Sequence, residues 1–184
     1  MVSLASVTSR FEIPFTVIEG GRGVVRGVLT ETDQNSQPSY IFVQPRHVLR
    51  TRYPTALRPG MVLQTKAGSI FIVGANGPSE NTRGTLWQSF RLFEPTAQVE
   101  WRRRQKVMDP IAKVLREGGE PELLGRIWVA IEPMDREAYD VTLRTSFEQT
   151  RFITGAAVQS DDLVGNRAVT KVDKQLGLSI GVLT

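Results

Sequence analysis

The residues that could do chemistry in this chain are few, and the first is its single histidine, His47. A Ser-His-Asp triad would have to use this imidazole as its general base. The flanking segment QPRHVL, residues 44–49, contains no Gly-x-Ser-x-Gly nucleophile elbow. The chain has no cysteine, which excludes disulfides, thiolate nucleophiles and thiolate zinc sites. We therefore interpret His47 as a half-exposed loop residue and expect neither a resident metal nor another cofactor.

Two pairs of carboxylates lie close together in the sequence, Glu132 with Asp135 and Asp161 with Asp162. Acid/base catalysis needs two carboxyl groups that are held in different environments across a cleft. Both pairs stand among polar residues at the ends of predicted strands, which favours solvated turns or subunit contacts. With no other catalytic constellation, the sequence predicts that the chain is not an enzyme.

The glycine-rich segment GGRGVVRG, residues 20–27, resembles a phosphate-binding loop only in composition. A dinucleotide fingerprint that starts at Gly21 needs glycine where Arg26 stands, and no Lys-Ser/Thr pair follows. The segment also leads into a predicted strand, so no helix N-terminus would face a phosphate. A hairpin turn is the better interpretation.

The most basic segment is WRRRQK, residues 101–106. On a strand, successive side chains point to opposite faces, so three of its cations would line one face and one the other. Such a row could follow DNA phosphates without reading sequence, in a salt-sensitive way. Alternatively, these cations form ion pairs on the surface or between subunits, with a nearby acidic run as the partner. The candidate cations are Arg102, Arg103, Arg104 and Lys106, and the candidate interface acids are Glu132, Asp135, Glu137 and Asp140.

The composition suits a folded chain with a mildly basic surface. It has 184 residues, of which 40% are hydrophobic and 23% charged, and a formal net charge of +4. This length fits one ordinary domain or two small ones. The opening MVSLASVTSRFEIPF is a poor match to a signal peptide, and no apolar segment reaches the length that crosses a bilayer. We expect synthesis in the cytoplasm and no membrane partner.

Short runs of β-branched and aromatic residues, broken by glycine and proline, predict a mainly β fold. We expect a small antiparallel β-barrel or sandwich architecture, as one barrel or two, with long loops at 32–39 and 76–83. The segment 98–108 is ambiguous, and a strand is favoured because Pro110 blocks a continuous helix. The predicted strands are residues 11–18, 24–30, 40–43, 61–65, 69–73, 86–93, 98–108, 126–131, 140–147, 150–154, 161–164, 168–172 and 178–183.

One short helix is expected over residues 111–116. Asp109 would be its N-cap and Pro110 its first residue, and Gly118-Gly119 would end it. This helix falls in a basic linker or excursion at 97–125, between an N-terminal β-barrel-like half at 1–96 and a C-terminal β half at 126–184.

The C-terminal half carries a set of segments that resembles a known family. They are GRIWVAIEP (125–133), a variable tract with Thr142 and Arg144, FIT (152–154), DDLV (161–164), VD (172–173) and LGL (176–178). Together they are similar to the small β-barrel proteins of tailed-bacteriophage necks, the head-completion, stopper or head–tail joining proteins. The excursion from Trp101 to Gly125 is similar to the long excursions of such barrels.

This resemblance implies a structural virion protein that forms a ring of six or twelve copies. Such a ring sits in the neck or collar between the portal or adaptor and the tail-tube or terminator proteins, and it makes non-specific contact with the double-stranded DNA that passes through. It would place the basic segment 101–106 at the lumen or at a subunit seam. The loops at 32–39 and 76–83 would be subunit-contact arms.

The alternative is a nucleic-acid-binding β-barrel of the oligonucleotide-binding type. In that hypothesis four aromatic residues are stacking platforms for bases: Trp87, Phe90, Trp101 and Trp128. Against it, aromatic side chains at alternating strand positions are more often part of a core.

Overall fold

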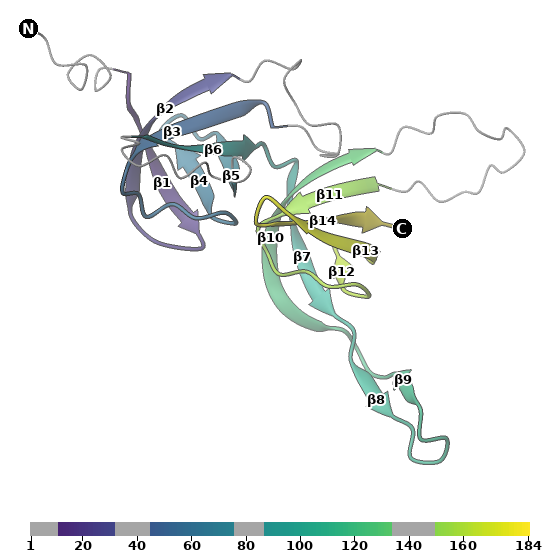
Figure 1. The fold of residues 1–184 in the computed structure, drawn as a ribbon. Helices are drawn as coiled ribbons and strands as arrows, with labels where there is room; N and C mark the ends of the chain where they lie inside the picture. Colours follow the sequence, from purple (N-terminus) through teal and green to yellow (C-terminus); the bar gives the residue numbers. More distant parts are fainter. Residues whose placement is uncertain (1–10, 32–44, 76–86, 134–149) are drawn as a thin grey trace, which may run out of the picture.

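A computed structural model describes residues 11–31, 45–75, 87–133 and 150–184. Within these ranges all regular structure is β, in two closed six-stranded antiparallel barrels and one two-stranded sheet (Figure 1). The mainly β fold predicted from the sequence is therefore confirmed, and it takes the two-barrel form. Within the same ranges, no helix is long and apolar enough to cross a membrane.

Barrel 1 is formed by the strands between residues 13 and 93. Its order around the barrel is β1-β2-β3-β6-β5-β4. The hairpin turn predicted at the glycine-rich segment joins β1 to β2, and Gly20 and Gly23 adopt the positive φ values that glycine permits. Side chains of alternate residues fill the interior, as the period of a strand requires. The strands are β1 (Ile13–Glu19), β2 (Val24–Glu31), β3 (His47–Arg52), β4 (Val62–Thr65), β5 (Ile70–Ala75) and β6 (Trp87–Phe93).

Barrel 2 is formed by the strands between residues 97 and 183. Its order is β10-β11-β14-β13-β12-β7. Strand β7 comes first in the sequence and closes the barrel by pairing with both β12 and β10. Beyond the barrel, β8 (Lys106–Met108) and β9 (Leu115–Glu117) pair only with each other among the described strands. The barrel strands are β7 (Ala97–Arg103), β10 (Glu122–Pro133), β11 (Thr150–Thr154), β12 (Leu163–Val164), β13 (Arg167–Gln175) and β14 (Leu178–Leu183).

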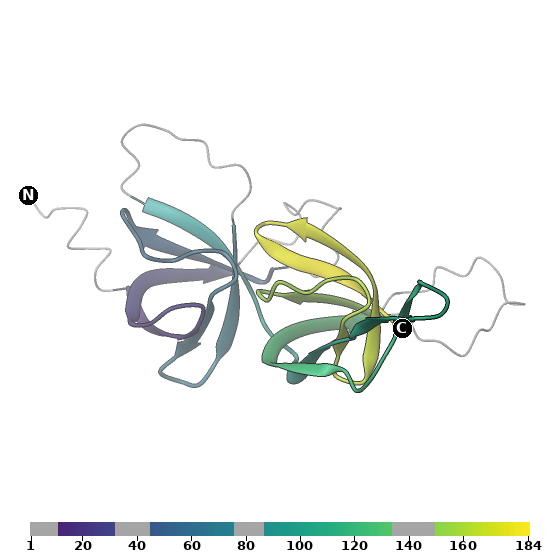
Figure 2. The same cartoon turned by 90° about the horizontal axis from the view of Figure 1, so that it is seen from below.

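The two barrels lie side by side and share an apolar cluster (Figure 2). Strands at the contact are buried on both faces, which is why they read as nearly continuous apolar runs. In β10, for example, Ile127 and Val129 point into barrel 2, whereas Trp128 and Ala130 pack toward barrel 1. The contact is also close at the backbone, because a Cβ on Gly155 would lie 2.1 Å from the carbonyl oxygen of Gly60. The buried members of the cluster are Val62, Ile72, Phe93, Ala130, Ile153, Leu178 and Ile180.

The sequence-based prediction of a short helix at 111–116 is wrong. These residues form the turn and the start of the return strand of the β8–β9 hairpin, and no helix occurs in the described ranges. Two observations give the reason. Lys113 has a φ of 53°, which no right-handed helix accepts, and the amide of Asp109 donates to the carbonyl of Val114 at 2.9 Å, which closes a hairpin.

Two further expectations differ from the structure. His47 is the first residue of strand β3 and not a loop residue, and the sequence analysis did not predict this strand. The expected linker at 97–125 supplies strand β7 to barrel 2, and β10 begins within it at Glu122. The strands predicted at 40–43 and 140–147 and the loops at 32–39 and 76–83 lie outside the described residues.

Candidate functional site

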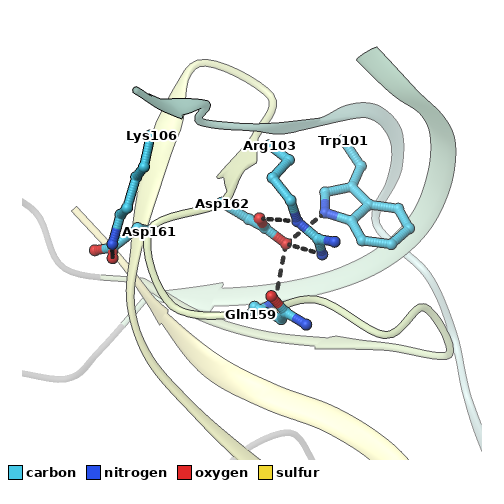
Figure 3. Close-up of polar contacts among 6 residues, drawn as sticks. All are labelled: Trp101, Arg103, Lys106, Gln159, Asp161 and Asp162. Atoms are coloured by element: carbon cyan, nitrogen blue, oxygen red, sulfur yellow. Dashed lines mark hydrogen bonds and ion pairs between the residues drawn. The ribbon is translucent and has the colours of Figure 1, made fainter. Parts of the chain in front are cut away.

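The basic segment 101–106 ends strand β7 at the rim of barrel 2, where it meets the Asp161-Asp162 pair. The Arg103 guanidinium donates twice to the Asp162 carboxylate, from Nε to Oδ1 at 3.0 Å and from Nη2 to Oδ2 at 3.1 Å. The Trp101 indole Nε1 and the Gln159 backbone amide also donate to Oδ2, at 2.8 and 2.9 Å (Figure 3). Asp162 is therefore the acceptor that ties β7 to the segment before β12.

The charge of Asp162 is stabilised in this position. Burial raises the pKa of the Asp162 carboxyl, but the hydrogen bonds from Arg103, the Gln159 amide and Trp101 outweigh burial and hold the pKa below its ordinary value. The side chain of Asp162 is only 3% exposed, whereas that of Arg103 is 36% exposed. The arrangement is a buried carboxylate under a partly hydrated guanidinium, which is a structural ion pair and not an acid/base site.

The other cations of the segment also interact within the chain. Arg102 donates to Glu100 Oε2 from Nη2 at 2.7 Å, and this hydrogen bond lowers the pKa of Glu100. Lys106 Nζ lies 3.3 Å from Asp161 Oδ2, on the surface (Figure 3). Arg104 lines a hollow of about 250 Å³ with Gly118 and its neighbours. The positive charge of the segment is thus largely offset by nearby acids.

Among the described residues, the acids that contact this segment are Glu100, Asp161 and Asp162. Glu132 lies in strand β10, where its backbone pairs with Arg151. Asp135, Glu137 and Asp140 lie outside the described residues. The role of all eight candidate residues at a lumen or subunit interface stays a prediction.

After β7 ends at Arg103, the chain extends away from barrel 2 as a β-hairpin (Figure 1). We call residues 104–121, with β8 and β9 at their centre, the arm. Lys106, Val107 and Met108 pair with Glu117, Arg116 and Leu115. Gly118 allows a close approach at the base of the arm, because a Cβ there would lie 2.6 Å from Val107 Cγ2.

The tip of the arm is organised by Asp109. Its Oδ1 accepts hydrogen bonds from the backbone amides of Ile111 and Ala112, at 2.9 and 3.0 Å, and these two bonds lower the pKa of its carboxyl. Oδ2 forms an ion pair with Arg116 Nε at 3.1 Å. The Asp-Pro signal therefore does cap backbone amides, but the amides belong to a tight turn and not to a helix.

The arm exposes large apolar side chains on both strands and at its tip. Ile111 is 93% exposed, and four further side chains are 54–58% exposed. Several large apolar side chains exposed on one element of a folded chain make that element a candidate interaction site. The sequence analysis did not single out these residues, because it assigned part of the arm to a short helix and not to a hairpin. They are Val107, Met108, Ile111, Val114 and Leu115.

His47 contacts a carboxylate and an aromatic ring. Its Nε2 lies 2.8 Å from Glu94 Oε1, and its ring packs edge-on against Phe71 with 5.4 Å between the centroids. These contacts join the start of β3 to the segment after β6 through Glu94 and to β5 through Phe71. Among the described residues, no group of three or more His, Cys, Asp or Glu side chains could hold a metal ion.

Comparison with known proteins gives no relative. No protein-family model, curated protein or solved structure matches the chain. The function is therefore argued from the arm, the barrels and the sequence pattern.

Proposed function

We propose that this chain is a structural virion protein of a tailed phage, which forms a ring in the neck or collar and joins the head to the tail around the DNA channel. The observation that carries the proposal is the arm, which presents exposed apolar side chains on a hairpin that extends from barrel 2. In this proposal each arm packs against the next copy in the ring.

The physics of a hairpin supports an assembly role. An isolated two-stranded hairpin is marginally stable in water and needs a surface to pack on. Within the described chain, β8 and β9 pair only with each other, and Ile111 at the tip is almost fully exposed. An arm that packs on a different surface of the next copy makes a heterologous contact, and such contacts close into rings when the rotation allows it.

The choice of a phage neck rests on the resemblance in the C-terminal half. The segments that carry it and lie in described residues belong to barrel 2. GRIWVAIEP is part of β10, FIT is part of β11, and VD and LGL surround the β13–β14 turn. A compact barrel with a long excursion between its strands is also what that family implies.

The oligonucleotide-binding alternative is less well supported, because the four proposed stacking rings are engaged within the chain. Phe90 is in the core of barrel 1, and Trp128 packs against the cluster between the barrels. The rings of Trp87 and Trp101 lie under the guanidinium groups of Arg52 and Arg103, which are 5.9 and 5.6 Å from the ring centroids. Bases need an open aromatic face to stack on.

The test is the mass of the purified full-length chain by light scattering over a concentration series, with electron microscopy of the main species. The proposal predicts one discrete species of six or twelve times the 20.5-kDa chain mass and a ring in projection. A monomer at every concentration would contradict self-assembly into a ring.

A further inference from the structure

The outer face of barrel 1 carries a group of arginines that the sequence analysis did not single out. Arg50 and Arg52 alternate on β3 with the inward-facing Leu49 and Thr51, so both point outward. Arg26 lies on the same face of β2, and Arg91 on the same face of β6. We call these four residues the arginine face.

The register of the strands sets the spacing of these side chains. Arg50 lies opposite Val28 on β2 and opposite Ser89 on β6. Arg26 and Arg91 are each two residues from those partners, so they are diagonal neighbours of Arg50. Diagonal neighbours on a sheet are roughly 7–8 Å apart, which is within reach of long side chains. Arg26, Arg50 and Arg91 thus form a diagonal row over three adjacent strands.

Two members of the row, Arg26 and Arg50, have no acidic partner among the described residues. Glu12 Oε1 accepts a hydrogen bond from Arg52 Nε at 2.8 Å. Arg26 and Arg50 are both exposed. Like charges that are neighbours on one sheet face repel each other, so the row does not help barrel 1 to fold.

Two members of the arginine face, Arg26 and Arg50, are exposed side chains that barrel 2 leaves uncovered. The cluster between the barrels takes its barrel 1 residues from β4, β5 and the end of β6, and none of its members comes from β2 or β3. Barrel 2 therefore does not cover Arg26 or Arg50. The contrast with the segment 101–106 is clear, since three of the cations there are bonded to Glu100, Asp161 and Asp162.

We propose that the arginine face binds the phosphate backbone of double-stranded DNA. The planar guanidinium fork matches phosphate oxygens, and several such groups on a rigid sheet make a sequence-independent contact. Duplex is favoured over single strands because Trp87, which lies opposite Arg52, is covered by that guanidinium and offers no open ring for a base.

This inference concerns a surface other than the arm, and it can hold or fail separately from ring formation. It rests on the proposed function in one respect only, namely that a neck protein has duplex DNA as its neighbour. The mass of each variant is therefore measured in the same buffers as its binding of DNA.

The experiment is a fluorescence anisotropy titration of the full chain with a labelled duplex of mixed sequence, between 50 and 200 mM salt. Each phosphate contact contributes about −0.9 to the slope of log K against log salt, so contacts from the exposed Arg26 and Arg50 predict a loss of roughly tenfold over this range for a single chain. The double variant Arg26→Gln/Arg50→Gln should bind more weakly at 50 mM salt, and its affinity should lose most of this salt dependence.

Two controls keep the result specific. Lys66→Gln/Lys171→Gln removes the same charge from exposed side chains of barrel 1 and barrel 2 outside the arm and the arginine face, and should bind like the unaltered chain. Arg26→Lys/Arg50→Lys keeps the charge and should retain most of the binding. Circular dichroism should show that all variants fold, since the altered side chains are exposed.

The proposal is overturned if Arg26→Gln/Arg50→Gln binds duplex as the unaltered chain does, or if the lysine control loses as much affinity. It is also overturned if a single strand of the same sequence binds more tightly than the duplex. If the chain forms rings that do not bind duplex, the DNA-binding inference is wrong and the ring proposal stands. If a monomer binds duplex, the ring proposal is wrong and the DNA-binding inference stands.

Discussion

The guanidinium of Arg103 and the carboxylate of Asp162 form a two-point ion pair between residues 59 positions apart, with donor–acceptor distances of 3.0 and 3.1 Å. The pair joins the end of β7, from which the arm extends, to the segment that leads into β12. Because Asp162 also accepts from Trp101 and from the Gln159 amide, one carboxylate anchors the base of the arm to barrel 2.

Replacing Asp162 by asparagine should destabilise the chain by about 1–3 kcal/mol, because the amide has the shape of the carboxylate but cannot accept all four hydrogen bonds. This loss of stability stays moderate because the Arg103 side chain is partly hydrated. Urea unfolding measures the change. The matched control is Asp161→Asn, since Asp161 is exposed and its φ of 72° is one that asparagine tolerates. Equal losses in the two variants would contradict the anchoring role of Asp162.

The stability that Asp162 provides should depend on pH. Its pKa is lower in the folded chain than in the unfolded chain, so the unfolded chain binds the proton at a higher pH. The contribution is therefore complete above the ordinary aspartate pKa of about 3.9 and is lost as the pH falls through the folded pKa. The difference in unfolding free energy between the unaltered chain and Asp162→Asn should shrink from pH 6 toward pH 3. A difference that grows on acidification would contradict this sign.

Close backbone contact between the barrels should make Gly155 intolerant of a side chain. The added methyl of Gly155→Ala meets the backbone of Gly60 and not a movable side chain. Overpacking of this kind costs about 1–3 kcal/mol, which thermal unfolding detects. In the control Gly21→Ala the methyl meets the flexible end of Met61 at 3.0 Å, and a smaller loss is expected. Gly155→Ala with unchanged stability would mean that the barrels do not pack in this way.

Local sequence pattern was sufficient for most of the strands. The turn glycines at 20–23 and the KAG segment at 66–68 mark hairpins, and the strands on either side formed as predicted. Continuous apolar runs such as IFIV were also assigned correctly as strands, but their double-sided burial follows from packing between barrels. No local pattern in one strand reveals which surface covers its outer face.

The sequence-based predictions were wrong where one local sequence pattern is compatible with two different structures. Asp-Pro followed by apolar and basic residues suits a helix start, but the same Asp side chain can cap the amides of a tight turn. Strand β3 was missed because HVLRTR is rich in arginine and stands between prolines, although its alternation is that of a half-buried strand. The partner of Arg103 could not be predicted, since Asp162 approaches it only after barrel 2 has closed.

The arm is the part of the molecule on which the assembly proposal depends, and two of its side chains test it without disturbing the barrels. Ile111 and Val114 are largely exposed, so Ile111→Asp/Val114→Asp should leave the unfolding free energy of barrel 1 and barrel 2 unchanged within about 0.5 kcal/mol. Ile111→Val/Val114→Ile preserves the apolar surface and is the matched control.

The most direct measurement is the mass of these two variants and of the unaltered chain by light scattering at the same concentrations. The account predicts a discrete ring for the unaltered chain and for Ile111→Val/Val114→Ile, and a monomer for Ile111→Asp/Val114→Asp. A ring that forms equally well with both aspartates in place would show that the arm is not the contact between copies.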